Sequence, residues 1–94
     1  MSEKKEFDAI FRRAVEWMAD CGMMECRTVD KTVSTNYIGL HVSQMYFSHG
    51  KGRHFDLLFT DICFSVNRDN QGHVQCDDPM GAFDEFIEDC IKAR

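Results

Sequence analysis

Two apolar runs decide the fold of this chain: Tyr37-Ile38-Gly39-Leu40-His41-Val42-Ser43-Gln44-Met45-Tyr46-Phe47 and Phe55-Asp56-Leu57-Leu58-Phe59-Thr60-Asp61-Ile62-Cys63-Phe64-Ser65-Val66. Between them lies a polar segment interrupted by two glycines, His49-Gly50-Lys51-Gly52-Arg53-His54. Two β-rich runs separated by a short glycine-containing loop predict an antiparallel hairpin. A hairpin alone is marginal in water, so we expect helices or further strands to cover its apolar face.

The alternation of apolar residues changes parity within each run. The change falls at Ser43–Gln44 in the first run and at Thr60–Asp61 in the second. Because neighbouring side chains of a strand point to opposite faces, a parity change predicts a β-bulge or a break. The pattern fits either one bent hairpin or two smaller hairpins. The half-polar face of the sheet is predicted to carry Tyr37, His41, Tyr46 and Thr60.

An amphipathic helix is predicted at the start of the chain. Its apolar residues recur at three- and four-residue spacing and form one stripe: Phe7, Ile10, Phe11, Ala14, Val15, Trp17, Met18 and Cys21. Gly22 follows, where a left-handed glycine would end the helix. Residues 24–29 then predict a short strand, with a turn at Asp30–Lys31. Met23 and Met24 are expected to pack in the core beside Trp17.

A second amphipathic helix is predicted at the end of the chain. A turn over residues 67–72 and a short strand over residues 73–76 precede it. Asp78 and Pro79 then supply an N-cap and a first helical residue, and the apolar stripe contains Phe83, Phe86, Ile87, Cys90 and Ile91. The predicted fold class is α+β with the order α-β-β-β-β-α. An antiparallel meander of three to five strands carries both terminal helices, in a single domain over residues 1–94. The pattern leaves open which sheet face the helices cover.

Composition narrows the classes of protein to consider. The chain has 94 residues, a formal net charge of −5 and five cysteines. An odd cysteine number and the lack of a signal-peptide core predict reduced thiols and a cytoplasmic protein. The apolar runs are all well short of the roughly 20 residues that a membrane-spanning helix needs, so no membrane association is expected.

The charge is concentrated near the C-terminus. Residues 77–94 carry six acidic side chains against Lys92 and Arg94. This balance disfavours direct binding to nucleic acid and favours a basic or nucleic-acid-handling protein partner. The predicted contact residues are Asp84, Glu85, Glu88 and Asp89 on the last helix, with Lys51 and Arg53 of the glycine-containing loop as a second patch. The alternative for the acids is a solvated helix face.

No catalytic residues, metal ligands or cofactors are predicted. The chain lacks the signatures of hydrolases, metalloproteases, dinucleotide-binding enzymes and kinases, so a non-enzymatic protein is expected. Four side chains of the zinc-binding type are present, but their spacing is not that of zinc knuckles: Cys21, Cys26, His73 and Cys76.

These observations lead to three functional hypotheses. The first is a small acidic binding protein that inhibits a larger partner by occupying its surface, in the manner of phage anti-CRISPR proteins that evade host-defence nucleases. The second is an immunity- or antitoxin-like protein that neutralises a basic toxin. The third is a small-ligand or nucleotide-binding module that uses the polar sheet face and the glycine-containing loop. A homodimer through a strand edge near Val29 or Val74 is a further hypothesis.

Overall fold

The computed structural model describes residues 2–48, 50–61 and 63–93. Helix α1 (Ser2–Ala19) precedes strands β1 (Glu25–Val33), β2 (Tyr37–Tyr46), β3 (Gly52–Thr60), β4 (Phe64–Arg68) and β5 (Val74–Cys76), and helix α2 (Pro79–Lys92) follows them. The strands form one antiparallel sheet in the order β1-β2-β3-β4-β5. The predicted α+β meander with two terminal helices is therefore confirmed. Within the described ranges, no helix is long and apolar enough to cross a membrane.

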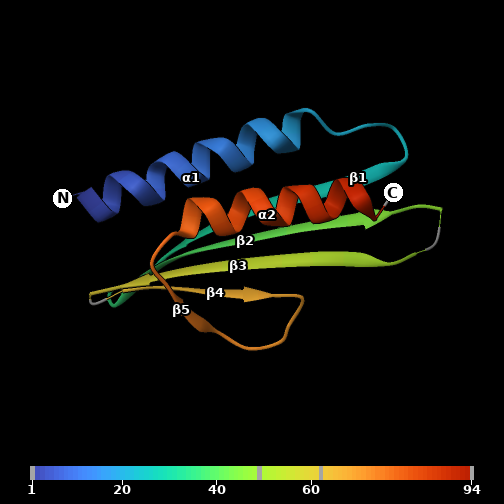
Figure 1. Ribbon diagram of the computed structural model, residues 1–94. Helices are drawn as coiled ribbons and strands as arrows, with labels where there is room; N and C mark the ends of the chain where they lie inside the picture. The colour runs from blue at the N-terminus through green and yellow to red at the C-terminus, as the bar shows by residue number, and fades with distance from the viewer. Residues whose placement is uncertain (1, 49, 62, 94) are drawn as a thin grey trace.

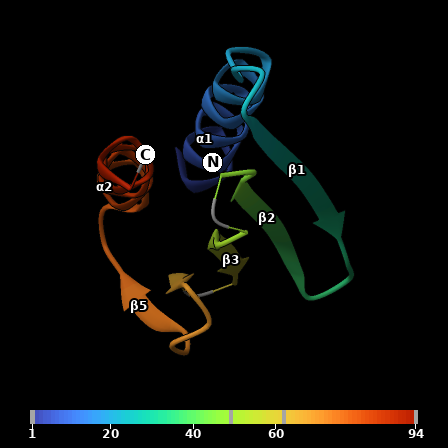
Figure 2. The same cartoon turned by 90° about the vertical axis from the view of Figure 1, so that its right-hand side faces the viewer.

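The molecule has two layers. Both helices lie on the same face of the sheet and run in the same direction (Figure 1). Seen from the end, the sheet curves around the pair (Figure 2). The core fills the space between the layers, and its buried apolar members come from both helices and from β2, β3 and β4: Phe7, Ile10, Ala14, Trp17, Leu40, Val42, Phe55, Leu57, Phe64, Val66, Phe83, Phe86 and Cys90.

Strand β1 is longer than predicted. It continues through Asp30 and Lys31, so the turn expected there is wrong, and the chain turns at residues 34–36 instead. Nine residue pairs join β1 to β2, which gives the longer strand its support. The two methionines expected in the core are also misplaced, since Met23 is 94% exposed and Met24 is 66% exposed.

Strand β2 contains no parity change. It pairs in continuous register with both neighbours, so the bulge predicted at Ser43–Gln44 is wrong. Gln44 and Tyr46 continue the inward-facing set, while Met45 faces outward and is 42% exposed. Tyr46 therefore does not belong to the half-polar outer face. The change at Thr60–Asp61 is a chain reversal between β3 and β4, so β3 forms one unbroken hairpin with β2 and a second, shorter hairpin with β4. Ile62 lies outside the described residues.

The C-terminal end of α1 is held by an arginine and not by a glycine. The helix ends at Ala19, and Gly22 does not adopt a positive φ. The guanidinium of Arg27 instead donates a hydrogen bond to the carbonyl of Trp17 in the last turn of the helix, which also accepts one from the amide of Asp20. The same side chain lies over the Trp17 ring, 4.4 Å from its centroid.

The N-terminus of α2 forms as predicted. Asp78 is the N-cap, Pro79 follows it, and the Asp78 carboxylate accepts a hydrogen bond of 3.0 Å from the amide of Gly81. A Cβ atom at position 81 would clash with the Asp78 carboxylate. The absence of a side chain at Gly81 is thus what allows the Asp78 cap to form.

The two edges of the sheet are β1 and β5. On β1, Arg27 and Lys31 point inward beneath α1, and the Lys31 ammonium lies 3.9 Å from the Asp8 carboxylate. Inward-pointing charges on an edge strand discourage pairing with another chain. Strand β5 is only three residues long. A homodimer through either edge stays a prediction.

A groove between the two helices as the candidate binding site

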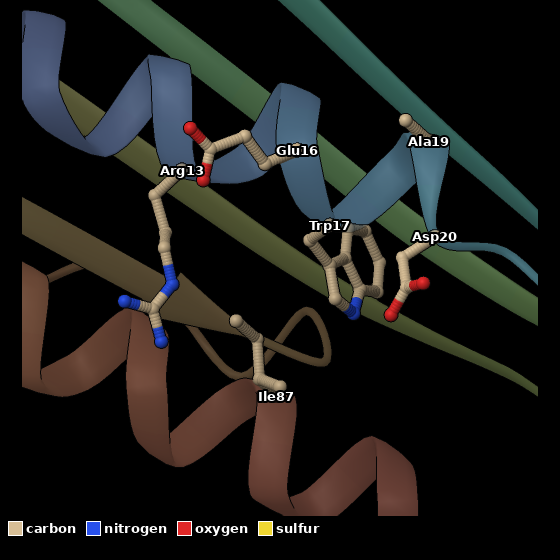
Figure 3. Close-up of a pocket in the computed structure, with 6 residues that line it drawn as sticks. All are labelled: Arg13, Glu16, Trp17, Ala19, Asp20 and Ile87. Carbon is tan, nitrogen blue, oxygen red and sulfur yellow. The ribbon is translucent and has the colours of Figure 1, made fainter.

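A surface groove of about 480 Å³ runs between α1 and α2. Helix α1 contributes most of its lining and α2 contributes Ile87 (Figure 3): Arg13, Glu16, Trp17, Ala19, Asp20 and Ile87. In Figure 3 Arg13 and Ile87 extend toward each other from opposite walls. The groove exists because both helices lie in one layer on the sheet, which leaves the space above their line of contact open.

The floor of the groove is apolar and firmly held. The Trp17 indole is 8% exposed and packs edge-on against Phe83 and Phe86, at 6.2 and 5.9 Å between ring centroids. Arg27 lies over the same indole. A side chain with neighbours on several sides loses little further freedom when a partner contacts it, so Trp17 provides a rigid floor of which only a small part is open to a partner. One turn beyond Ile87, the Ile91 side chain is 54% exposed and extends the apolar surface.

The rim of the groove is acidic. Glu16 lies exposed on α1, Asp20 lies exposed just beyond its last residue, and Glu88 lies exposed on α2. Within the described part of the chain, these three carboxylates form no salt bridge. Asp84 also lies on this side of α2, but Arg13 bridges to it across the groove at 2.9 Å. Two carboxylates without a salt bridge, Glu16 and Asp20, therefore line the groove, and Glu88 adds a third on the neighbouring surface of α2.

The four acids predicted on α2 do not form one surface. Asp84 faces α1, where it pairs with Arg13, and Glu88 lies one turn beyond it, whereas Glu85 and Asp89 lie on the other side of the helix, toward Arg68 of β4. There Arg68 donates hydrogen bonds of 3.0 Å to both Glu85 and Asp89. These internal pairs neutralise part of the acidity from which the contact surface was predicted. Glu88 alone of the four is without an ion pair among the described residues.

The second predicted patch is also partly neutralised. Lys51 and Arg53 line one hollow beside the β2–β3 turn, so the structure does bring them together. The Arg53 guanidinium, however, bonds to the Asp69 carboxylate at 2.8 Å and lies 3.6 Å from that of Asp89. Tyr46 lines the same hollow, and burial raises its pKa to about 12. Its hydroxyl donates a hydrogen bond of 2.7 Å to the carbonyl of Cys90.

The zinc-type side chains fall at opposite edges of the sheet. Cys26 is exposed on β1, while Cys76 lies on β5 and His73 just before it. A single ion cannot be reached from both edges. In the described ranges, no cluster of three or more histidine, cysteine or acidic side chains has a geometry suited to a metal ion.

The outer face of the sheet carries a polar cluster. His41 on β2 and Asp56 on β3 are directly paired in register and share a hydrogen bond. The ring of His54 stacks on that of His41 at 5.8 Å between centroids. This is the half-polar face expected from Tyr37, His41 and Thr60, and no described helix covers it (Figure 2).

Comparisons with known proteins give no assignment. No protein-family model matches the chain, and searches of curated proteins and of solved structures return no match. The interpretation of the groove therefore depends on its own geometry and charge.

Proposed function

We propose that this protein is a small non-enzymatic binding protein that occupies a basic surface of a larger protein through the groove between α1 and α2. The favoured version is an inhibitor of a nucleic-acid-handling host-defence nuclease, comparable to anti-CRISPR proteins and acting in the cytoplasm. Steric blocking of the site that handles nucleic acid would be the mechanism.

One observation supports the proposal: two carboxylates without a salt bridge, Glu16 and Asp20, line a groove with a rigid apolar floor, and Glu88 lies exposed nearby on α2. Elsewhere on α2 the acids are paired within the chain, at Arg13 and Arg68. An acidic face that served solubility alone would need no apolar surface at its centre, whereas binding interfaces combine an apolar core with a polar or charged rim. The sign of the rim repels phosphate groups and attracts lysine and arginine side chains.

The test compares matched charge reversals on one helix. Glu88→Lys places a cation on the groove rim, while Glu85→Lys makes the same charge change on the sheet side of α2, where Glu85 is 70% exposed. Each variant and the wild type are used to capture partners from a host lysate at low and high salt. We expect a basic, nucleic-acid-handling protein that is captured at low salt, lost with Glu88→Lys and kept with Glu85→Lys. Identical captured proteins for all three chains would contradict the proposal.

An immunity- or antitoxin-like role would use the same groove against a dedicated toxin. The salt dependence would be the same, but the partner would be encoded beside this chain. Co-expression with basic toxins encoded next to its gene distinguishes the two versions, because only a cognate toxin would be neutralised.

The outer sheet face supports a second candidate function. His41, Asp56 and His54 offer hydrogen-bonding groups on an uncovered surface, which suits a small polar ligand. A ligand that binds only the folded state raises the unfolding temperature by mass action. Thermal shifts with nucleotides, compared between the wild type and His41→Ala, test this alternative, and the absence of any shift would contradict it.

A further inference from the structure

We infer that the occupant of the groove between α1 and α2 is a single basic amphipathic α-helix of the partner protein. This inference rests on the proposed function, because it names the structural element that the acidic groove receives. It follows from the backbone chemistry of the walls, from the shape of the apolar floor and from the position of the charges.

The walls of the groove are two helices, and this determines what can bind between them. The backbone N–H and C=O groups in the middle of a helix are already bonded within it. A partner segment in an extended conformation would find no backbone partners along these walls and would bury its own N–H and C=O groups without hydrogen bonds, at a cost in free energy. A helix brings its backbone hydrogen bonds with it. The groove therefore favours a helical segment over an extended one.

The apolar floor matches one stripe of a helix. Trp17 lies at its centre, with Ile87 opposite and Ile91 one turn further along α2. The stretch of α1 that borders the groove, from Arg13 to Ala19, has seven residues, which corresponds to about 10 Å at 1.5 Å per residue. Two or three apolar side chains spaced at i, i+3 and i+4 would cover a floor of that length.

The charges lie on both sides of this floor. Glu16 and Asp20 line the groove on the α1 side, and Glu88 lies exposed on α2, one turn beyond Asp84, which Arg13 reaches across the groove. Lysine and arginine residues that flank the apolar stripe of a helix would reach both rims at once. Charge complementarity thus selects a basic helix over a neutral or acidic one, and it excludes nucleic acid as the occupant.

The chain contains one tryptophan, so Trp17 fluorescence reports on the groove alone. The probe is a synthetic helix of about 18 residues with a leucine stripe flanked by lysine and arginine and without tryptophan or tyrosine. Two control peptides have nearly the same amino-acid composition as the probe. One carries two central prolines, which prevent a continuous helix, and the other disperses the leucines around the helix. Peptide anisotropy measures affinity while Trp17 emission reports the site.

We expect the striped helix to bind at least tenfold more tightly than either control and to shift the Trp17 emission. Ile91→Ser should weaken it, whereas Val74→Ser, at a 69% exposed valine on β5, should not. Equal binding of all three peptides would overturn the helical inference and leave the acidic surface in place. Binding without a change in Trp17 emission, or no binding up to millimolar peptide, would also overturn it. Tight helix binding that is insensitive to Glu88→Lys would contradict the proposed role of the acidic rim and leave the helical groove standing.

Discussion

Replacement of Arg27 by methionine should be among the most damaging single changes outside the apolar core. The Arg27 side chain is 4% exposed and lies against the Glu25 carboxylate, which is 7% exposed, at 3.1 Å. It also donates a hydrogen bond of 2.7 Å to the side-chain oxygen of Gln44 and another to the carbonyl of Trp17. Methionine fills most of the volume but leaves the Glu25 charge without the guanidinium it faces.

The expected loss is about 3–5 kcal/mol, the range for removing one member of a buried ion pair. A domain of this size has a total stability of about 5–15 kcal/mol, so about a fifth or more of it would be lost. Urea unfolding followed by far-ultraviolet circular dichroism measures the change. Fluorescence is unsuitable here, because the substitution alters the surroundings of Trp17 directly.

A double variant separates the charge effect from packing. In Glu25→Gln/Arg27→Met both charges are absent, so it should be more stable than Arg27→Met alone, because no buried carboxylate is left facing an apolar side chain. Arg27→Lys keeps the charge but not the forked geometry, and should fall between wild type and Arg27→Met. A loss below about 1 kcal/mol for Arg27→Met would refute the reasoning, since an exposed pair contributes no more than that.

Three further outcomes are expected from the described contacts. Gly81→Ala should destabilise the wild type by up to about 1 kcal/mol, because the added methyl group displaces the Asp78 cap. In the Asp78→Ala background the same change should be stabilising, since only the higher helix propensity of alanine remains. Urea unfolding of the wild type, the two single variants and the double variant tests this reversal of sign. Tyr46→Phe should cost about 1 kcal/mol for its buried hydrogen bond. The folded-state pKa of Tyr46 is raised from 10.0 to about 12, so the folded protein holds a proton that the unfolded chain has lost. The stability due to Tyr46 is thus fully present below pH 10 and falls as the pH rises toward 12, and unfolding measured across that window should show no such loss in Tyr46→Phe. Arg68→Ala should cost only about 1 kcal/mol, since its partly exposed pairs are screened by solvent, and calorimetry would contradict this with a loss of several kcal/mol.

The helices were predictable because their signals are local. Asp78 and Pro79 mark the start of α2 within two adjacent residues, and the apolar stripes have the helical period. The sheet as a meander was predictable for the same reason, since each strand is joined to the next by a short turn. The strand faces were harder. In β2, Gln44 and Tyr46 face inward while the more apolar Met45 faces outward, so hydrophobicity alone predicted a bulge that does not exist.

The groove could not be predicted because it depends on where the helices lie relative to each other. The acids of α1 at Glu16 and Asp20 were visible on the polar side of the helix, but the sequence does not say which of them faces α2. The one-turn spacing of these two acids beside Trp17 was the signal in the sequence that could have indicated an acidic surface near this residue. Likewise, the inward direction of Arg27 follows the parity of Val29 on the same strand, yet its partners are defined only once the end of α1 is in place.

The order of the strands has a consequence for how the molecule folds. Every strand pairs with its neighbour in the sequence, so the sheet can form by successive local hairpins with little loop-closure entropy at each step. The contact between α1 and α2 is different, because it joins the first element of the chain to the last, as between Arg13 and Asp84. The groove between the two helices therefore forms only after α2 has docked on the sheet. A chain emerging from the ribosome would lack this surface until α2 was free, and a chain truncated before α2 would never have it.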